Sequence, residues 1–118
     1  MTTEFTSLNL RPELEQAITD LGYVTPTAIQ EGMIPLMLTG VDVIGQAQTG
    51  TGKTAAFALP ILHNYIHQRL PQALVLTPTR ELAVQVAEAI HAYGKYRGTT
   101  VLPVYGGQPI ERQLRALS

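Results

Sequence analysis

The residues best suited to chemistry in this chain lie in one short glycine-rich stretch. Its sequence is AQTGTGKT, formed by Ala47, Gln48, Thr49, Gly50, Thr51, Gly52, Lys53 and Thr54. A glycine, four residues and then Gly-Lys-Ser/Thr is the pattern of a phosphate-binding loop, and Ala47 stands where that pattern has its first glycine. Glycines allow successive backbone N–H groups to turn inward around an anion, and a helix beginning near Lys53 would point its positive end at the same place. The stretch therefore predicts nucleotide phosphate binding. The alternative is a turn that only joins a strand to a helix.

Two side chains of this loop match the needs of a bound nucleotide. The Lys53 ammonium group would neutralise charge on the β- and γ-phosphates, and the Thr54 hydroxyl would be a ligand of Mg²⁺. Lys53 is one of two lysines in the chain, the other being Lys95. We therefore expect Lys53 and Thr54 to be the catalytic residues of the loop, with Thr54 as the metal ligand.

Strands and helices are expected to alternate around this loop. Apolar runs predict strands at residues 41–46, 73–77 and 100–105, each followed by a helix, at residues 53–67, 80–93 and 110–117. Residues 11–21 predict a first helix that Gly22 ends, and Thr25-Pro26 signals a second helix that Pro35 should break. The expected core positions on these helices include Leu14, Ala17, Ile18, Leu21, Phe57, Ile61, Leu62 and Ile66. The predicted fold class is α/β, a parallel sheet flanked by helices.

Size and composition narrow the possibilities. With 118 residues, 45% of them hydrophobic and 14% charged, the chain is long enough for one modest domain with a core. The absence of cysteine excludes disulfides, thiolate metal sites and a Cys nucleophile. There is no leader-like start and no run near the ~20 apolar residues of a membrane span, so we expect a cytoplasmic protein outside any membrane. A net charge of −1 means that nucleic-acid binding would need local geometry.

Four separate features give the chain a family resemblance. Gly22-Tyr23-Val24-Thr25-Pro26-Thr27-Ala28-Ile29-Gln30 is similar to the Q motif of DEAD-box ATP-dependent RNA helicases, and Phe5 stands where that family has an isolated upstream aromatic residue. AQTGTGKT is similar to the family's motif I, in which Ala is common at the first position. Pro78-Thr79-Arg80-Glu81-Leu82-Ala83 is similar to motif Ia, and Gly106-Gly107 to the GG doublet. From Phe5 to Gly107 the chain resembles the first RecA-like domain of these helicases.

The resemblance implies a P-loop NTPase with an incomplete RecA-like sheet. Residues 1–40 would form a Q-motif helical region, and residues 41–118 the first part of the ATP-binding domain. ATP with Mg²⁺ would be the cofactor, held by residues 47–54 together with Phe5, Thr25 and Gln30. The Gln30 carboxamide can donate to and accept from the N6 and N7 edge of adenine, whereas guanine presents two acceptors there. Taken alone, Gln30 would more often be a solvated helical residue and Phe5 a core aromatic.

For RNA, the resemblance implies backbone contacts from Pro78, Thr79, Arg80, Gly106 and Gly107. Arg80 and Thr79 lie where a predicted strand meets a helix N-terminus, and there N–H groups and a guanidinium can hold a phosphate oxygen. Taken alone, Arg80 would more often be a surface residue paired with Glu81, and the glycines a simple turn. Since backbone contacts carry no sequence information, RNA binding without strong sequence preference is expected.

The machinery for hydrolysis is not apparent in these residues. An NTPase needs an acid at a strand end to hold Mg²⁺, but the acids after Lys53 are Glu81, Glu88 and Glu111, all in predicted helices. The family's Asp-Glu-Ala-Asp and Ser-Ala-Thr motifs and its second RecA-like domain do not occur in the sequence. We expect an N-terminal fragment that alone binds ATP weakly, does not hydrolyse it and is marginally stable. Sheet partners of residues 41–46 and 73–77 would lie outside it.

Two other functions remain open. A different P-loop enzyme, such as a small-molecule kinase or a GTPase, would have no adenine-selective Gln30. A non-catalytic nucleotide-binding scaffold would tolerate the loss of Lys53.

Overall fold

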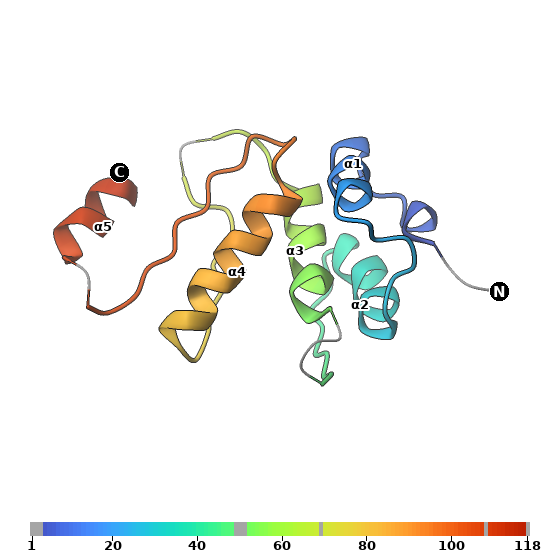
Figure 1. Ribbon diagram of the computed structural model, residues 1–118, viewed down its shortest axis with the longest axis horizontal. Helices are drawn as coiled ribbons and strands as arrows, with labels where there is room; N and C mark the ends of the chain where they lie inside the picture. Colours follow the sequence, from blue (N-terminus) through green and yellow to red (C-terminus); the bar gives the residue numbers. More distant parts are fainter. Residues whose placement is uncertain (1–3, 49–51, 69, 108, 118) are drawn as a thin grey trace.

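The computed structural model describes residues 4–48, 52–68, 70–107 and 109–117. In chain order its elements are a 3-10 helix η1 (Phe5–Leu8) and the α-helices α1 (Pro12–Asp20), α2 (Ala28–Leu38), α3 (Lys53–His63), α4 (Arg80–Tyr93) and α5 (Ile110–Leu117). Helix α3 lies between α4 on one side and α1 and α2 on the other, and α5 stands apart at the end of a long connection (Figure 1). No helix in the described ranges has the length and apolarity needed to cross a membrane.

The core forms where α3 packs against its neighbours. Leu59 and Leu62 of α3 are buried with Leu14 and Ile18 of α1 and Ile34 of α2. The small residues Ala55, Ala56 and Ala58 on α3 are buried as well. Their short side chains allow the neighbouring helices to pack closely on α3, which is the central element of the fold. The first residue of α3, Lys53, belongs to the predicted phosphate-binding loop.

Helix α1 forms as its sequence predicts. Pro12 occupies the first turn, where its missing N–H costs nothing, and Glu13 and Glu15 face the positive end of the helix. Gly22 follows with φ of +80°, the left-handed conformation that glycine adopts at helix ends. The prediction for Leu21 was wrong. Leu21 lies just beyond the helix and is 44% exposed, so it does not extend the apolar face.

Helix α2 differs from its prediction at both ends. It begins at Ala28, with Thr27 rather than Thr25 as the N-cap, and it runs through Pro35 to Leu38 without a break. Pro35 and Glu31 are both exposed. Water can therefore hydrate the Glu31 carbonyl that the missing proline N–H leaves unpaired, which makes a proline tolerable at this position.

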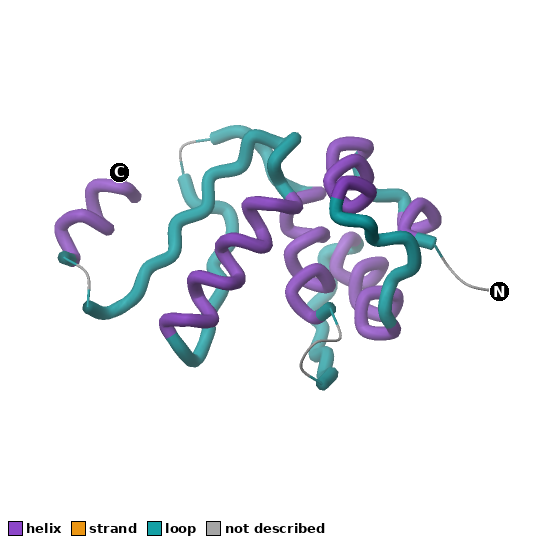
Figure 2. Tube along the Cα trace, viewed as in Figure 1, coloured by secondary structure: helices purple, strands orange, loops and turns teal. Residues whose placement is uncertain are grey.

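The three predicted strands are absent from the described residues. Residues 41–46, 73–77 and 100–105 are connecting segments, and every described residue in Figure 2 is drawn as helix or loop. A strand of a parallel sheet exists through hydrogen bonds to its neighbours, and none of the backbone bonds found outside the helices joins these segments. Several of their apolar side chains face solvent, Ile44 being 94% exposed and Leu74 and Leu76 each 84%, while Val75 and Val101 are partly buried against the core. Propensity and apolarity alone therefore did not make strands.

Helix α3 ends at His63, four residues before its predicted end. Two guanidinium groups take the carbonyls of its last turn: Arg11 Nε donates to the His63 carbonyl at 2.8 Å, and Arg97 Nε to that of Leu62 at 3.2 Å. Beyond the end, Ile66 is 58% exposed and is not the core residue that the pattern predicted. His63 Nδ1 accepts the Arg11 backbone N–H, and burial with the charges of Arg11 and Arg97 lowers the pKa of His63. The cations of two distant segments therefore fix this end of the helix.

An ionic contact joins the end of α1 to the segment after α4. Asp20 Oδ2 pairs with Lys95 Nζ at 3.0 Å and accepts a hydrogen bond from the Tyr96 hydroxyl, while Oδ1 accepts from Gln16 Nε2 at 3.1 Å. These contacts, with that of Tyr96 the largest, lower the pKa of Asp20 to about 2 from its ordinary 3.8.

We expect this contact to make stability depend on acid pH. Because the pKa of Asp20 is lower in the folded protein, its contribution is complete above the ordinary value of 3.8 and is lost as pH falls through about 2. When thermal unfolding is measured across that pH range, the midpoint temperature of Asp20→Asn should decrease less with falling pH than that of the wild type. Asp42→Asn, which removes an exposed carboxylate elsewhere, should leave the fall unchanged. Equal slopes for wild type and Asp20→Asn would contradict the assignment.

Candidate functional site

The start of α3 has the features of an anion site. Its N-cap, Gly52, has φ of +83° and ψ of +25°, a left-handed conformation that favours glycine, and Lys53 is the first helical residue. No described side chain caps the first turn, which also contains no acidic residue. The other four α-helices each have a glutamate in their first turn. At α3 the N-terminal N–H groups and the positive helix end are therefore left for an external anion.

The remaining loop residues are described only in part. Lys53 is exposed, Thr54 and Ala47 are half-buried, and Gln48 is exposed. Ala47 does not have a positive φ, in agreement with the tolerance of alanine at this position. Thr49, Gly50 and Thr51 lie outside the described residues, so their predicted part in phosphate binding stays a prediction.

Gln30 connects the Q-motif region to this loop. It is the N3 residue of α2 and only 3% exposed, and its Oε1 accepts the Thr27 backbone N–H at 2.9 Å. Its Nε2 donates to the Gly52 carbonyl at 3.1 Å. A Cβ at Gly52 would lie 2.3 Å from that Nε2, so glycine is required for this close approach. Gln30 is thus no solvated helical residue but the contact between α2 and the phosphate loop.

The Gln30 carboxamide keeps capacity for a ligand. A carboxamide offers two N–H donors and two acceptor lone pairs. The bonds to Thr27 and Gly52 use one of each. One donor and one acceptor remain, which is the pair that the N6 and N7 edge of adenine complements.

The two aromatic residues near the N-terminus, Phe5 and Tyr23, differ in their exposure to solvent. Phe5 is only 4% exposed and belongs to the core, and its ring is stacked on that of Tyr23 with centroids 6.1 Å apart and planes at 26°. Tyr23 itself is 41% exposed. The Tyr23 ring also lies 6.2 Å from that of Tyr93, and the two hydroxyls are 3.5 Å apart, so Tyr23 joins the region of Phe5 to α4. The sequence pattern assigned no role of its own to Tyr23, the aromatic residue directly after the helix-ending Gly22. Thr25, the other predicted ATP contact in this region, is exposed.

A second group of predicted residues meets at the start of α4. Thr79 is the N-cap, and its hydroxyl accepts the Leu82 N–H at 3.1 Å, which leaves the O–H of that hydroxyl to donate to a ligand. The Arg80 side chain is 60% exposed and approaches Glu81 at 3.8 Å, the weak surface pair that its position predicted. Pro78 is exposed beside them. This helix start is accessible to a large anionic ligand.

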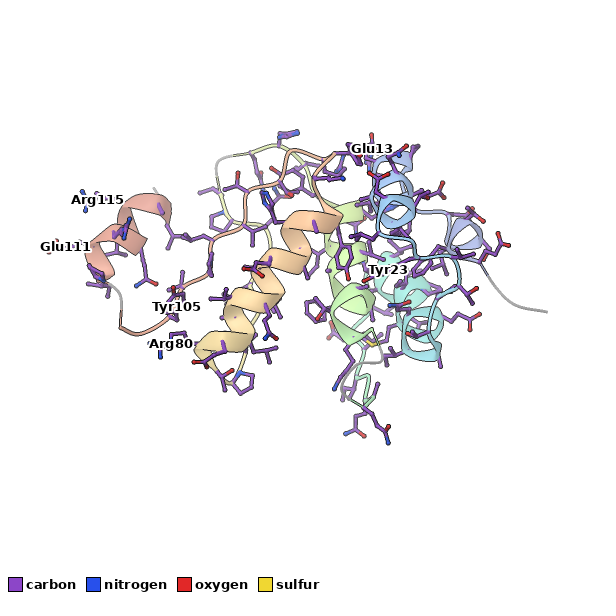
Figure 3. All side chains as sticks on the ribbon, viewed as in Figure 1. Glu13, Tyr23, Arg80, Tyr105, Glu111 and Arg115 are labelled. Atoms are coloured by element: carbon purple, nitrogen blue, oxygen red, sulfur yellow. The ribbon has the colours of Figure 1, made fainter. Side chains whose placement is uncertain are left out.

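The glycine doublet lies next to that helix start although it is far along the chain. Gly106 and Gly107 form an exposed turn, and a Cβ at Gly107 would lie 3.2 Å from Arg80 Nη1. Figure 3 shows Tyr105, which precedes the doublet, on the same side of α4 as Arg80. The fold therefore brings together two motifs that the sequence separates. Helices α3 and α4 also begin at the same edge of the molecule (Figure 1), so their first residues, Lys53 and Arg80, lie at one side.

Comparison with known proteins shows the family of the chain. A family model described as DEAD/DEAH box helicase matches residues 27–118. An ATP-dependent RNA helicase DeaD of Buchnera aphidicola (from Acyrthosiphon pisum) is 59% identical over 115 residues, which cover 96% of this chain and 19% of the relative. The chain thus spans about a fifth of the length of such relatives.

Solved structures give the same result. A DEAD box protein from Methanococcus jannaschii matches with a TM-score of 0.86 and 41% identity, over 97% of this chain and 32% of that one. Dbp5 from Saccharomyces cerevisiae, bound to RNA and ADP BeF3, matches with a TM-score of 0.74 and 42% identity, over 79% and 25% of the two chains.

The solved structures that this chain resembles are RecA-like DEAD-box helicase domains, consistent with a P-loop NTPase fold, whereas the described residues of this chain form helices and no strands. Because the family model matches most of the chain, the chain belongs to the DEAD/DEAH box helicase family.

Proposed function

We propose that the whole protein carrying this chain is an ATP-dependent RNA helicase, and that this chain supplies its phosphate loop, adenine contact and part of its RNA surface. The relatives' names support the activity. The single observation that carries the site is the 3.1 Å hydrogen bond from Gln30 Nε2 to the Gly52 carbonyl. This hydrogen bond holds the Gln30 carboxamide, which complements adenine, beside the loop that would bind phosphates. A single ligand that contains both adenine and phosphates, such as ATP, would therefore suit the site.

ATP would be bound by residues of three segments. The first-turn N–H groups of α3 and the Lys53 ammonium would hold the phosphates, and Gln30 would read adenine with Tyr23 stacking on the base. The uncapped, acid-free first turn of α3 fits a nucleotide phosphate. Thr54, at the second position of that helix, would be a ligand of Mg²⁺, which when bound neutralises charge on the β- and γ-phosphates.

RNA would be bound along the neighbouring helix start. The Arg80 guanidinium, the main chain of Pro78 and Thr79 just before α4, and the Gly106-Gly107 turn are all exposed. Phosphate contacts of this kind are independent of sequence. We propose, further, that the exposed apolar residues Ile44, Leu74 and Leu76 become buried when residues 41–46 and 73–77 join a parallel sheet of the whole protein, which would also contain the second RecA-like domain.

The proposed function is tested by RNA-stimulated ATP hydrolysis and by binding of a fluorescent single-stranded RNA to the whole protein. We expect Arg80→Ala to weaken RNA binding about tenfold, the effect of one charge-assisted hydrogen bond, and to lower the salt slope of the affinity by about 1. Arg112→Ala, which removes an exposed arginine of α5, is the matched control and should change neither. ATP hydrolysis that does not respond to RNA would count against a helicase.

A further inference from the structure

We infer that Gly107 is a positioning residue for Arg80: its missing side chain leaves the space in which the Arg80 guanidinium lies. The inference rests on the proposed function, because it concerns how the RNA surface is held. Glycine in such a doublet would ordinarily be explained by close approach of RNA to its own main chain. The distances at Gly107 indicate a contact within the protein as well.

The two glycines of the doublet have different surroundings. Gly107 has φ of +87°, and a Cβ built on it would lie 3.2 Å from Arg80 Nη1, closer than an ordinary van der Waals contact. Gly106 lacks a positive φ, and a Cβ on it would meet nothing within 4 Å. The two positions are thus adjacent in sequence, but only Gly107 borders the guanidinium.

Little else holds Arg80 in place. Its side chain is 60% exposed, and among the described residues the carboxylate within ion-pair distance is that of Glu81, 3.8 Å away. A long exposed side chain with one weak partner is placed mainly by the room that its neighbours leave. A side chain at position 107 would therefore displace the guanidinium, and the positive φ of Gly107 would add backbone strain to that effect.

The turn that borders Arg80 is itself anchored. The Tyr105 backbone N–H donates to Oε1 of Gln113 at 2.9 Å, and Gln113 is only 8% exposed although it lies on α5. This bond fixes the chain two residues before Gly107. The turn is therefore a defined boundary against which the Arg80 side chain lies.

The test is a double-mutant cycle in the whole protein, with a fluorescent single-stranded RNA of about 20 nucleotides as the probe. Gly107→Ala should weaken RNA binding about three- to tenfold and lower the salt slope by about 1, as loss of the Arg80 phosphate contact would. In the Arg80→Ala background the same substitution should change the affinity by less than about twofold. Gly106→Ala is the matched control and should have an effect below about twofold in either background.

A second variant distinguishes backbone strain at the positive φ of Gly107 from displacement of the Arg80 side chain. Asparagine tolerates the left-handed conformation better than alanine but still has a Cβ, so Gly107→Asn should reproduce the loss of affinity with less effect on thermal unfolding. Additive effects of Gly107→Ala and Arg80→Ala, or an unchanged salt slope, would overturn the inference. An Arg80→Ala variant that binds RNA as the wild type does would instead overturn the RNA surface of the proposed function.

Discussion

Replacing Lys53 by alanine is expected to weaken ATP binding by the whole protein about 10- to 100-fold, since a hydrogen bond to a charged group contributes ~1.5–3 kcal/mol. Lys53 is the first residue of α3, directly after the left-handed Gly52, in a turn without an acidic residue or a side-chain cap. Its ammonium group would face the β- and γ-phosphates, where charge accumulates in phosphoryl transfer. RNA-stimulated hydrolysis should therefore fall more than binding does. Calorimetric titration with ATP and a phosphate-release assay measure the two effects.

The matched control for Lys53 is the other lysine of the chain. Lys95 pairs with Asp20 at 3.0 Å, at the end of α4. Lys95→Ala removes the same charge and should leave ATP affinity unchanged at temperatures where the protein stays folded. A Lys53→Ala protein that keeps its cellular function would support the scaffold alternative over the helicase.

Replacing Gln30 should affect both stability and the choice of nucleotide. Gln30→Ala leaves the Thr27 N–H and the Gly52 carbonyl without their partner at a site that is 3% exposed. Such a loss costs ~1–3 kcal/mol of unfolding free energy. The adenine contact is lost with it, so the preference for ATP over GTP in a competition assay should fall about tenfold.

Two further variants separate these effects. Gln30→Glu keeps an acceptor for Thr27 but sets a carboxylate oxygen against the Gly52 carbonyl, so the loop should be disturbed while the α2 cap survives. Gln113→Ala removes the other buried glutamine, which accepts the Tyr105 N–H, and should lower stability without altering nucleotide choice. An unchanged ATP-to-GTP ratio in Gln30→Ala would favour a different P-loop enzyme.

Much of the helical structure could be predicted because its signals are local. The bounds of α4 and α5 agree with their predicted ranges, and α3 begins at the predicted residue. Caps, first-turn acids and apolar spacing act within one or two turns. The predicted helix ends were wrong where contacts with distant residues or exposure to solvent set the end of the helix. Arg11 and Arg97 end α3 early, and exposure to water lets α2 continue through Pro35.

The candidate site shows the same division. The loop residues, Gln30 and Arg80 could be named from their types and spacing alone. The hydrogen bond of Gln30 to Gly52, the burial of Phe5 behind Tyr23 and the approach of Gly107 to Arg80 could not. Each of these joins segments that lie 18 or more residues apart, and no short-range pattern encodes such contacts.

The sequence by itself determined the helices and the family and predicted a phosphate-binding loop, since these depend on residue type and on neighbours along the chain. Only the tertiary structure decided which residues share a surface and whether the apolar segments at 41–46, 73–77 and 100–105 form strands. A helix satisfies its backbone hydrogen bonds internally, whereas a strand needs a partner strand. For that reason the described residues contain the expected helices and no strands.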